Sequence, residues 1–200
     1  MPDQDAPPPP EYRPQISLER EGDLTLDDHE AIGAMLGRAL PDHDHWFLGG
    51  RSWLGLQPEL RVVARSGDVV VAHAGLRRVF VRVGDTERLV TSVGLVAVSP
   101  ILQGMGEGTR LLAAVDEALA LLGGHPGVVL APESVTGFFT RAGWLPLESV
   151  TGGARTGHFS AASADGAGLR VSEDSGWLTR ASSARASWPD GDLHWNSQLV

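Results

Sequence analysis

The sequence predicts a single mixed α/β (α+β) domain, with a mostly antiparallel central sheet flanked by helices. Short β-branched segments separated by turn residues fill residues 60–98, which is typical of antiparallel strands. Residues 89–122 then form a pattern of buried strand, glycine-rich turn and helix. A further strand and a short helix follow at residues 127–142. Two hundred residues are enough for one domain with a sizeable core.

The N-terminal part predicts a leader, a strand and a helix. Residues 1–14 contain four consecutive prolines among acidic residues, so we expect a disordered or polyproline leader and a domain over residues 15–200. Ile16–Glu19 is a candidate edge strand. A helix is expected to begin at Thr25, because Asp28 completes a capping box, and to end before Pro41. Its apolar stripe consists of Ile32, Met35, Leu36, Ala39 and Leu40.

The middle of the chain predicts a run of antiparallel strands. Residues 60–65 and 69–76 are apolar and β-branched, and Ser66-Gly67-Asp68 between them is a hairpin signal. A separate strand is expected at residues 77–83, followed by a turn at Gly84-Asp85 that leads into residues 89–98.

The segment after this last strand is suited to an anion. Pro100 ends the strand, and residues 103–108 follow the pattern Gln-x-x-Gly-x-Gly. Glycines allow close approach of the backbone, and the helix expected to begin near Gly108 presents unpaired N–H groups and a partial positive charge. Its apolar face consists of Leu111, Val115, Ala118, Leu119 and Leu122. A glycine turn that binds nothing is the alternative.

Two other phosphate-binding motifs are excluded. A P-loop requires a lysine after its last glycine, and all 16 basic residues of this chain are arginine. A dinucleotide fold requires an acidic residue about 20 positions after the glycines, where this chain has His125-Pro126-Gly127.

The charge is unevenly distributed along the chain. The net charge is −9, but residues 51–110 carry 8 basic and 5 acidic residues, so the segment with the glycine loop is the basic one. An anionic ligand fits that segment, whereas the acidic remainder excludes a nucleic-acid-binding protein. The acidic remainder also favours a cationic acceptor. The alternative is that these acidic side chains are solvated and have no part in binding.

The composition narrows the protein class further. Without cysteine, disulfides, thiolate metal sites and a thiol nucleophile are excluded. No apolar run approaches 18 residues and the N-terminus lacks a signal pattern, so we expect a cytoplasmic protein with no membrane partner.

The segment Val96-Ala97-Val98-Ser99-Pro100, with the glycine loop after it, resembles the acyl-coenzyme A loop of the GNAT acyltransferase superfamily. The resemblance continues through the strand at residues 127–131, the helix at residues 133–142 and Gly143-Trp144, and it covers residues 15–150. It implies the GNAT fold and an acetyl-CoA or longer acyl-CoA donor. The residues implied in binding this donor are Val96, Ala97, Val98, Gln103, Gly104, Met105, Gly106, Glu107, Gly108, Thr109, Ser134 and Phe139.

Further matches point to acyltransferases that act on amino sugars. Arg51-Ser52-Trp53, Pro58-Glu59-Leu60-Arg61 and Ala72-His73-Ala74-Gly75 are similar, in order, to the nodulation protein A family, as is Trp188-Pro189-x-Gly191. That family transfers a fatty acyl group from an acyl carrier protein to a glucosamine oligosaccharide. The aminoglycoside 2′-N-acetyltransferases share Ala72-His73-Ala74 and a C-terminal Trp-x-x-Gly-Asp.

The chain departs from these families at catalytic positions. Ser92 and Gly94 stand where the two families carry glutamate, and Phe139 stands where many GNAT enzymes carry the tyrosine that protonates the leaving thiolate. Our candidates for catalysis are therefore His73, Ser92 and Asp192. For His73 the alternative is a structural role. For Ser134, a candidate for binding the donor, the alternative is that it caps the N-terminus of a helix.

The acceptor is expected to contact acidic and aromatic residues. The candidates are Asp42, Asp44, Trp46, Trp53, Trp188 and Asp190. For Asp42-His43-Asp44-His45 the alternatives are a turn and a metal site in an extended segment, but two histidines and two aspartates are incomplete as a ligand set, so no metal is expected.

These observations predict an N-acyltransferase that acts on the primary amine of an amino sugar or aminoglycoside-like small molecule. An acyl carrier protein is an alternative donor, and it would bind a basic surface formed by Arg77, Arg78, Arg82 and Arg88. The oligomeric state is left open, with a homodimer as one alternative. A degenerate GNAT domain that senses acyl-CoA without turnover is the rival function, and a scaffold that uses the proline-rich leader is another.

Overall fold

The computed structural model describes residues 13–151, 157–162, 169–174, 176–181, 188–189 and 193–195. Most of the predicted leader therefore lies outside the described residues, as do Asp190 and Asp192.

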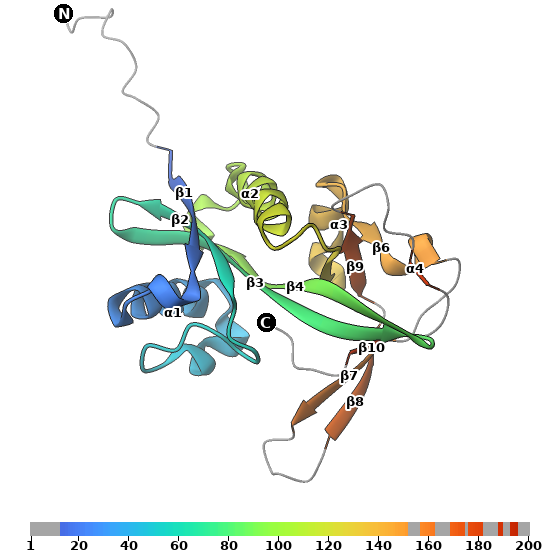
Figure 1. Cartoon of the computed structure of the whole chain (residues 1–200). Coiled ribbons are helices and arrows are strands. Elements are labelled where there is room, and N and C mark those ends of the chain that lie inside the picture. Colours follow the sequence, from blue (N-terminus) through green and yellow to red (C-terminus); the bar gives the residue numbers. More distant parts are fainter. Residues whose placement is uncertain are drawn as a thin grey trace, which may run out of the picture.

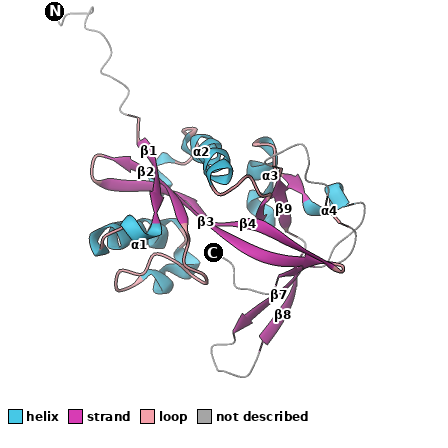
Figure 2. Cartoon of the chain, viewed as in Figure 1, coloured by secondary structure: helices cyan, strands magenta, loops and turns pink. Residues whose placement is uncertain are grey.

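Helices lie on both sides of the sheet and separate several of its strands along the chain (Figures 1 and 2). The α-helices are α1 (Leu26–Ala39), α2 (Glu107–Leu121), α3 (Glu133–Arg141) and α4 (Leu147–Thr151). The 3₁₀ turns are η1 (Glu21–Asp23), η2 (Pro41–Phe47) and η3 (Pro100–Leu102). Within the described ranges, no helix is long and apolar enough to span a bilayer.

The strands form one mixed sheet. They are β1 (Gln15–Arg20), β2 (Leu60–Ser66), β3 (Val69–Val83), β4 (Thr86–Val98), β5 (Gly127–Leu130), β6 (Leu145–Pro146), β7 (Gly157–Ala162), β8 (Leu169–Asp174), β9 (Trp177–Arg180) and β10 (Leu193–Trp195). The order is β6-β9-β5-β4-β3-β10-β7-β8, with β2 also on β3 and β1 on β2. Among the strand pairs of the described residues, only β4–β5 and β10–β7 are parallel, so the predicted mostly antiparallel sheet is confirmed.

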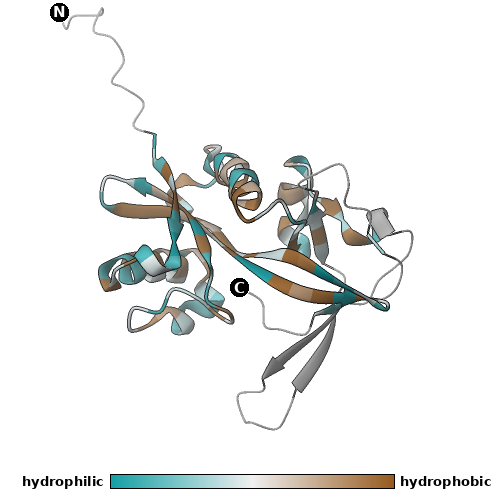
Figure 3. Cartoon of the chain, viewed as in Figure 1, coloured by the Kyte–Doolittle hydropathy of each residue, from teal (hydrophilic) through white to brown (hydrophobic). Residues whose placement is uncertain are grey.

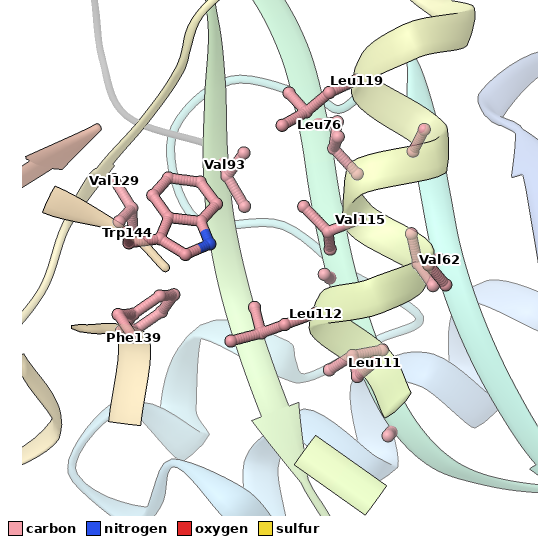
Figure 4. Close-up of a cluster of buried hydrophobic side chains, with 14 of the residues drawn as sticks. Val62, Leu76, Val93, Leu111, Leu112, Val115, Leu119, Val129, Phe139 and Trp144 are labelled. Atoms are coloured by element: carbon pink, nitrogen blue, oxygen red, sulfur yellow. The ribbon is translucent and has the colours of Figure 1, made fainter. Parts of the chain in front are cut away.

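The two long helices cover opposite faces of the sheet (Figure 1). The apolar stripe of α2 packs on β2, β3 and β4 together with Phe139 and Trp144, and Figure 4 shows its leucines and Val115 directed at the strands. On the other face, Ile32, Met35 and Leu36 of α1 are fully buried. Brown segments of α2 and the strands mark this apolar packing in Figure 3. Both stripes were predicted from helical periodicity.

The predicted start of α1 is also confirmed. The Thr25 hydroxyl accepts from the Asp28 amide at 3.3 Å, and the Asp28 carboxylate accepts from the Thr25 amide at 3.0 Å. These bonds satisfy donors that an uncapped helix would leave open.

The prediction of two strands over residues 69–83 was wrong, because they form the single strand β3. Its ladder with β4 continues from Ala72 to Val83 and is irregular only between His73 and Gly75. Pairing with β2 as far as Leu76 and with β4 as far as Val83 keeps the segment extended through residues 76 and 77.

Candidate active site

The glycine loop leads directly into helix α2. After η3, Gly104 and Gly106 have φ angles of 80° and 88°, in the left-handed region that glycine adopts without steric cost. Gly106 is the N-cap of α2, and no side chain caps the helix. The first turn therefore keeps its donors, as an anion site at a helix N-terminus requires.

Four amide groups gather at this point. In the described part of the chain, the amides of Gly104, Gly106, Glu107 and Gly108 donate to no intramolecular acceptor, whereas those of Met105 and Thr109 bond to Leu102 and Gly106 carbonyls. Successive free N–H groups at the positive end of a helix dipole can hold a diphosphate.

One acidic side chain lies in this turn, and it is neutralised. The Glu107 carboxylate accepts two bonds from Arg110 Nη1 at 2.8 and 3.0 Å. Arg110 Nη2 also donates to the Pro14 carbonyl at 3.0 Å, which fixes the start of β1 beside the loop. The pair removes the repulsion that a free carboxylate would exert on a bound phosphate.

Strands β4 and β5 diverge beside the loop. They pair only at Thr91 and Ser92, so β4 has no ladder partner on its β5 side from Val93 to Val98. The Val98 carbonyl accepts from Gln103 Nε2 at 3.0 Å, which joins the strand to the loop. This divergence leaves an edge of backbone that a pantetheine arm can pair with.

His73 does not lie at this open edge. It is fully buried on the α1 side, with Nδ1 3.0 Å from the Leu95 carbonyl and Nε2 3.0 Å from Arg61 Nη1. The Leu95 carbonyl can only accept, so Nδ1 carries the proton and Nε2 accepts from the guanidinium. Both ring nitrogens are occupied, which argues against a direct role as a catalytic base, and the part that His73 takes in catalysis stays a prediction.

The ionisation of His73 agrees with this placement. Burial first, and then the charge of Arg61, lower the pKa of His73 from 6.5 to about 3, although its bond to the Leu95 carbonyl opposes the shift. The ring is therefore neutral at physiological pH, and it has no free lone pair with which to take a proton from an amine.

Arg61 is the centre of this buried group. Its guanidinium has no exposed surface and binds both oxygens of the Glu21 carboxylate, at 2.5 and 3.1 Å, and the Ser52 carbonyl at 3.0 Å. Ser52 in turn contacts His29 Nδ1 through its hydroxyl at 2.8 Å. We call Glu21, Ser52, Arg61 and His73 the Arg61 cluster.

Two residues predicted to bind the donor belong to helix α3. Phe139 is buried in the main core, with its ring 5.6 Å from that of Trp144, and its neighbour Phe138 lies against Gly108 instead. Ser134 is exposed in the first turn of α3, whose N-cap is Pro132, so the N-cap alternative was wrong.

The other candidates have mixed outcomes. Ser92 is buried on β4, paired with Arg77 and Val128 at the last β4–β5 contact, and its catalytic role stays a prediction. Trp188 packs, half-buried, on the cluster that contains Trp177 and Trp195.

The Asp42–Trp46 segment forms η2 and is exposed. Of the two alternatives the structure has the turn and not the extended segment, because Pro41 begins a 3₁₀ turn in which residues three apart share a face. Asp42 and Asp44 therefore point in different directions. Among the described residues, no three acidic or histidine side chains are grouped to hold a metal.

Arg51 lies beside both Trp46 and Trp53, two residues that were predicted to contact the acceptor. The guanidinium carbon of Arg51 lies 5.2 Å from the ring centroid of Trp46 and 5.9 Å from that of Trp53. Arg51 is held by the carbonyls of Trp53 and Leu54, at 2.9 and 2.5 Å. The result is a fixed aromatic surface on which 41% of Trp46 remains exposed.

The sequence matches a known family. A model of the family "Nodulation protein A (NodA)" matches residues 13–193, which is most of the chain. The chain belongs to the NodA family. Sequence similarity to individual NodA proteins is more restricted, at 38% identity over 98 residues for Sinorhizobium terangae and 40% over 100 residues for Sinorhizobium fredii. Each alignment covers 47% of this chain, which spans about half the length of these curated relatives.

Solved structures place this NodA-family chain in the GNAT fold. The GNAT family N-acetyltransferase YhbS from Escherichia coli, solved in complex with CoA, has a TM-score of 0.61 at 15% identity and covers 94% of this chain and 92% of its own. An acetyltransferase from Brucella melitensis, in complex with acetyl-CoA, has a TM-score of 0.55 at 18% identity, covering 91% and 96%. At these identities the likeness establishes the fold alone.

Sequence reasoning missed the Arg61 cluster as a unit. Arg61 stands among apolar residues in a strand predicted to be buried, and a buried arginine requires acceptors. This signal could have predicted a polar group behind the sheet, but the identity of its partners depends on strand register.

Proposed function

We propose that this NodA-family chain is an N-acyltransferase that moves an acyl group from acyl-CoA to the primary amine of an amino sugar. The observation that carries the proposal is the set of four free amides at the start of α2, beside the diverging edges of β4 and β5. The solved structures with CoA and acetyl-CoA share this fold, which supports the choice of donor.

Each part of the donor would have its own binding residues. The amides of Gly104, Gly106, Glu107 and Gly108 would hold the diphosphate, and residues 96–98 of β4 would pair with the pantetheine arm. A backbone N–H on the open edge of β4 would polarise the thioester carbonyl, as an oxyanion hole does. In the reaction a C–N bond forms, the C–S bond breaks, and the amine proton leaves through water.

The acceptor would lie on the aromatic surface of Trp46 and Trp53. A sugar ring presents apolar C–H groups that pack on indole, and Arg51 keeps the two rings in place. Asp42, Asp44 and, near the C-terminus, Trp188, Asp190 and Asp192 are proposed to anchor the cationic amine. An acyl carrier protein remains the alternative donor.

The proposal is tested by thiol release. The purified chain is incubated with acyl-CoA species of increasing chain length and with glucosamine, chitooligosaccharides carrying a free amine, and an aminoglycoside. Release of free thiol that depends on the amine, with the N-acylated sugar identified by mass spectrometry, supports it. No release with any pair of substrates contradicts it.

One observation favours a second function, an acyl-CoA sensor without turnover. His73 is occupied at both nitrogens, and the strand positions that carry glutamate in related enzymes are Ser92 and Gly94. A sensor would bind acyl-CoA tightly and show no acyl transfer with any amine, so binding and turnover measured on the same preparation separate the two functions.

A further inference from the structure

Strand β4 contains a bulge next to its open edge. Its ladder with β3 places two residues, Leu95 and Val96, opposite the single residue Ala74. The extra residue shifts the side-chain alternation, so Val93 packs on the α2 side of the sheet whereas Leu95 packs on the α1 side.

The bulge holds an unfavourable backbone conformation. Leu95 has a φ angle of 51°, and among the described residues every other positive φ belongs to glycine. A left-handed conformation is unfavourable for an L residue, so it persists only where neighbouring groups impose it. Something in the structure must therefore fix the peptide at Leu95.

The group that contacts this peptide is His73. Its Nδ1–H donates to the Leu95 carbonyl at 3.0 Å, and its Nε2 is held by Arg61 at 3.0 Å. Arg61 is anchored in turn by the Glu21 carboxylate and the Ser52 carbonyl. The ring is thus fixed in orientation and tautomer by a buried chain of charge-assisted bonds that begins at Glu21.

The effect passes through one planar peptide group. The Leu95 carbonyl and the Val96 N–H belong to the same trans peptide, so they point in opposite directions. A bond that directs the carbonyl at His73 therefore directs the Val96 N–H away from it. The same bond polarises the peptide and makes its N–H a stronger donor.

We infer that His73 is a positioning residue: it fixes the Leu95–Val96 peptide so that the Val96 N–H is the donor to the thioester carbonyl. The inference rests on the proposed function for the identity of the ligand, and on the bulge and the Arg61 cluster for the geometry. His73 touches no substrate and moves no proton.

Two substitutions at His73 separate this role from a merely structural one. In His73→Asn, the side-chain amide occupies the place of Nδ1 and can still donate to Leu95, but it loses Arg61. In His73→Gln, the amide reaches the place of Nε2 and can still accept from Arg61, but it loses Leu95. We expect Asn to keep kcat within about threefold and Gln to lower kcat about 100-fold, with little change in KM for acyl-CoA.

A structural role would give the reverse order, because Gln and not Asn satisfies the buried guanidinium. A kcat in His73→Gln equal to that of wild type, in a protein that unfolds cooperatively, overturns the inference.

A measurement without substrates separates this inference from the proposed function. In ¹⁵N spectra, the Val96 amide reports on the bond to the Leu95 carbonyl, and we expect it to shift in His73→Gln and to stay close to wild type in His73→Asn. If wild type releases no thiol, the proposed function fails, but the Val96 amide shift still shows whether His73 fixes the Leu95–Val96 peptide. A Val96 amide shift that is unchanged in His73→Gln contradicts the inference.

The wild-type protein supplies a test that needs no variant. A slowly exchanging His73 Nδ1 proton, with scalar coupling across the hydrogen bond to the Leu95 carbonyl carbon, is expected. A ring proton on Nε2 in place of Nδ1 overturns the inference.

Discussion

Phe138 of α3 lies against Gly108 in the first turn of α2, so closely that a Cβ on Gly108 would be 2.9 Å from Phe138 Cε2 and 3.0 Å from Cζ. The aromatic ring therefore fixes the distance between the helix that presents the free amides and the helix that follows β5. Gly108 is required here for packing, in addition to its place in the glycine loop.

This contact predicts that the effect of Gly108→Ala on the free energy of unfolding depends on whether Phe138 is present. Gly108→Ala forces the ring to move and should lower the free energy of unfolding by about 1–2 kcal/mol, since overpacking outweighs the better helix propensity of alanine. In a Phe138→Leu background the clash is relieved, and the same substitution should be neutral or stabilising. Urea unfolding of the four proteins measures this; equal effects of Gly108→Ala in both backgrounds would refute the contact.

The buried state of His73 predicts acid sensitivity. Its folded pKa of about 3 lies below its ordinary 6.5, so the unfolded chain binds the extra proton between these values. Stability contributed by neutral His73 is complete above pH 6.5 and is lost as the pH falls toward 3, at up to about 1.4 kcal/mol per pH unit. Urea unfolding at pH 4.5–7 should show this slope, and His73→Asn should flatten it. Parallel slopes in both proteins would contradict the assignment.

One arginine of strand β9 binds helix α2. Arg180 of β9 binds both carboxylate oxygens of Asp116 in α2, at 2.7 and 2.9 Å, and donates to the Gly143 carbonyl at 2.9 Å. Arg180→Lys keeps the charge but loses the two-point geometry, so it should destabilise the fold by about 1 kcal/mol in thermal or urea unfolding. Combined with Asp116→Asn the losses should not add; strict additivity would mean that the two side chains do not interact.

The aromatic surface predicts a selective effect on the acceptor. Trp46→Ala removes the exposed ring beside Arg51 and should raise KM for the amino sugar several-fold, as loss of a stacking contact worth about 1 kcal/mol would. The Kd for acyl-CoA should not change. Phe80→Ala is the matched control, because Phe80 is also an exposed aromatic residue, at 64%, on a different part of the sheet. An equal effect of both substitutions on KM would place the acceptor elsewhere.

Local patterns predicted the parts of the site that depend on local sequence. The spacing of Gly104, Gly106 and Gly108 and the periodic stripe of α2 specify a loop and a helix, because both are determined by residues within a few positions of each other. The capping box at Thr25 and the hairpin at Gly67 are predictable for the same reason.

The parts that could not be predicted depend on contacts between distant segments. His73 and Arg61 meet only because β2 and β3 pair in one register, and Glu21 reaches them from η1. The left-handed Leu95 is equally invisible in the sequence, since a leucine in an apolar strand gives no sign of a bulge. The same burial that brings His73 to Leu95 lowers its pKa far below the ordinary value of 6.5, which argues against the catalytic base that a histidine suggests.

The central claim is that the amides at the start of α2 hold the diphosphate of an acyl-CoA. Calorimetric titration of acetyl-CoA into wild type, Gly106→Asn and Gly106→Asp tests it, since Asn and Asp both tolerate the left-handed φ of Gly106 and differ in charge. Binding by wild type, a modest loss in Gly106→Asn and at least about a tenfold further loss in Gly106→Asp are predicted. No heat with wild type, or equal affinities in the Asn and Asp variants, would contradict the claim.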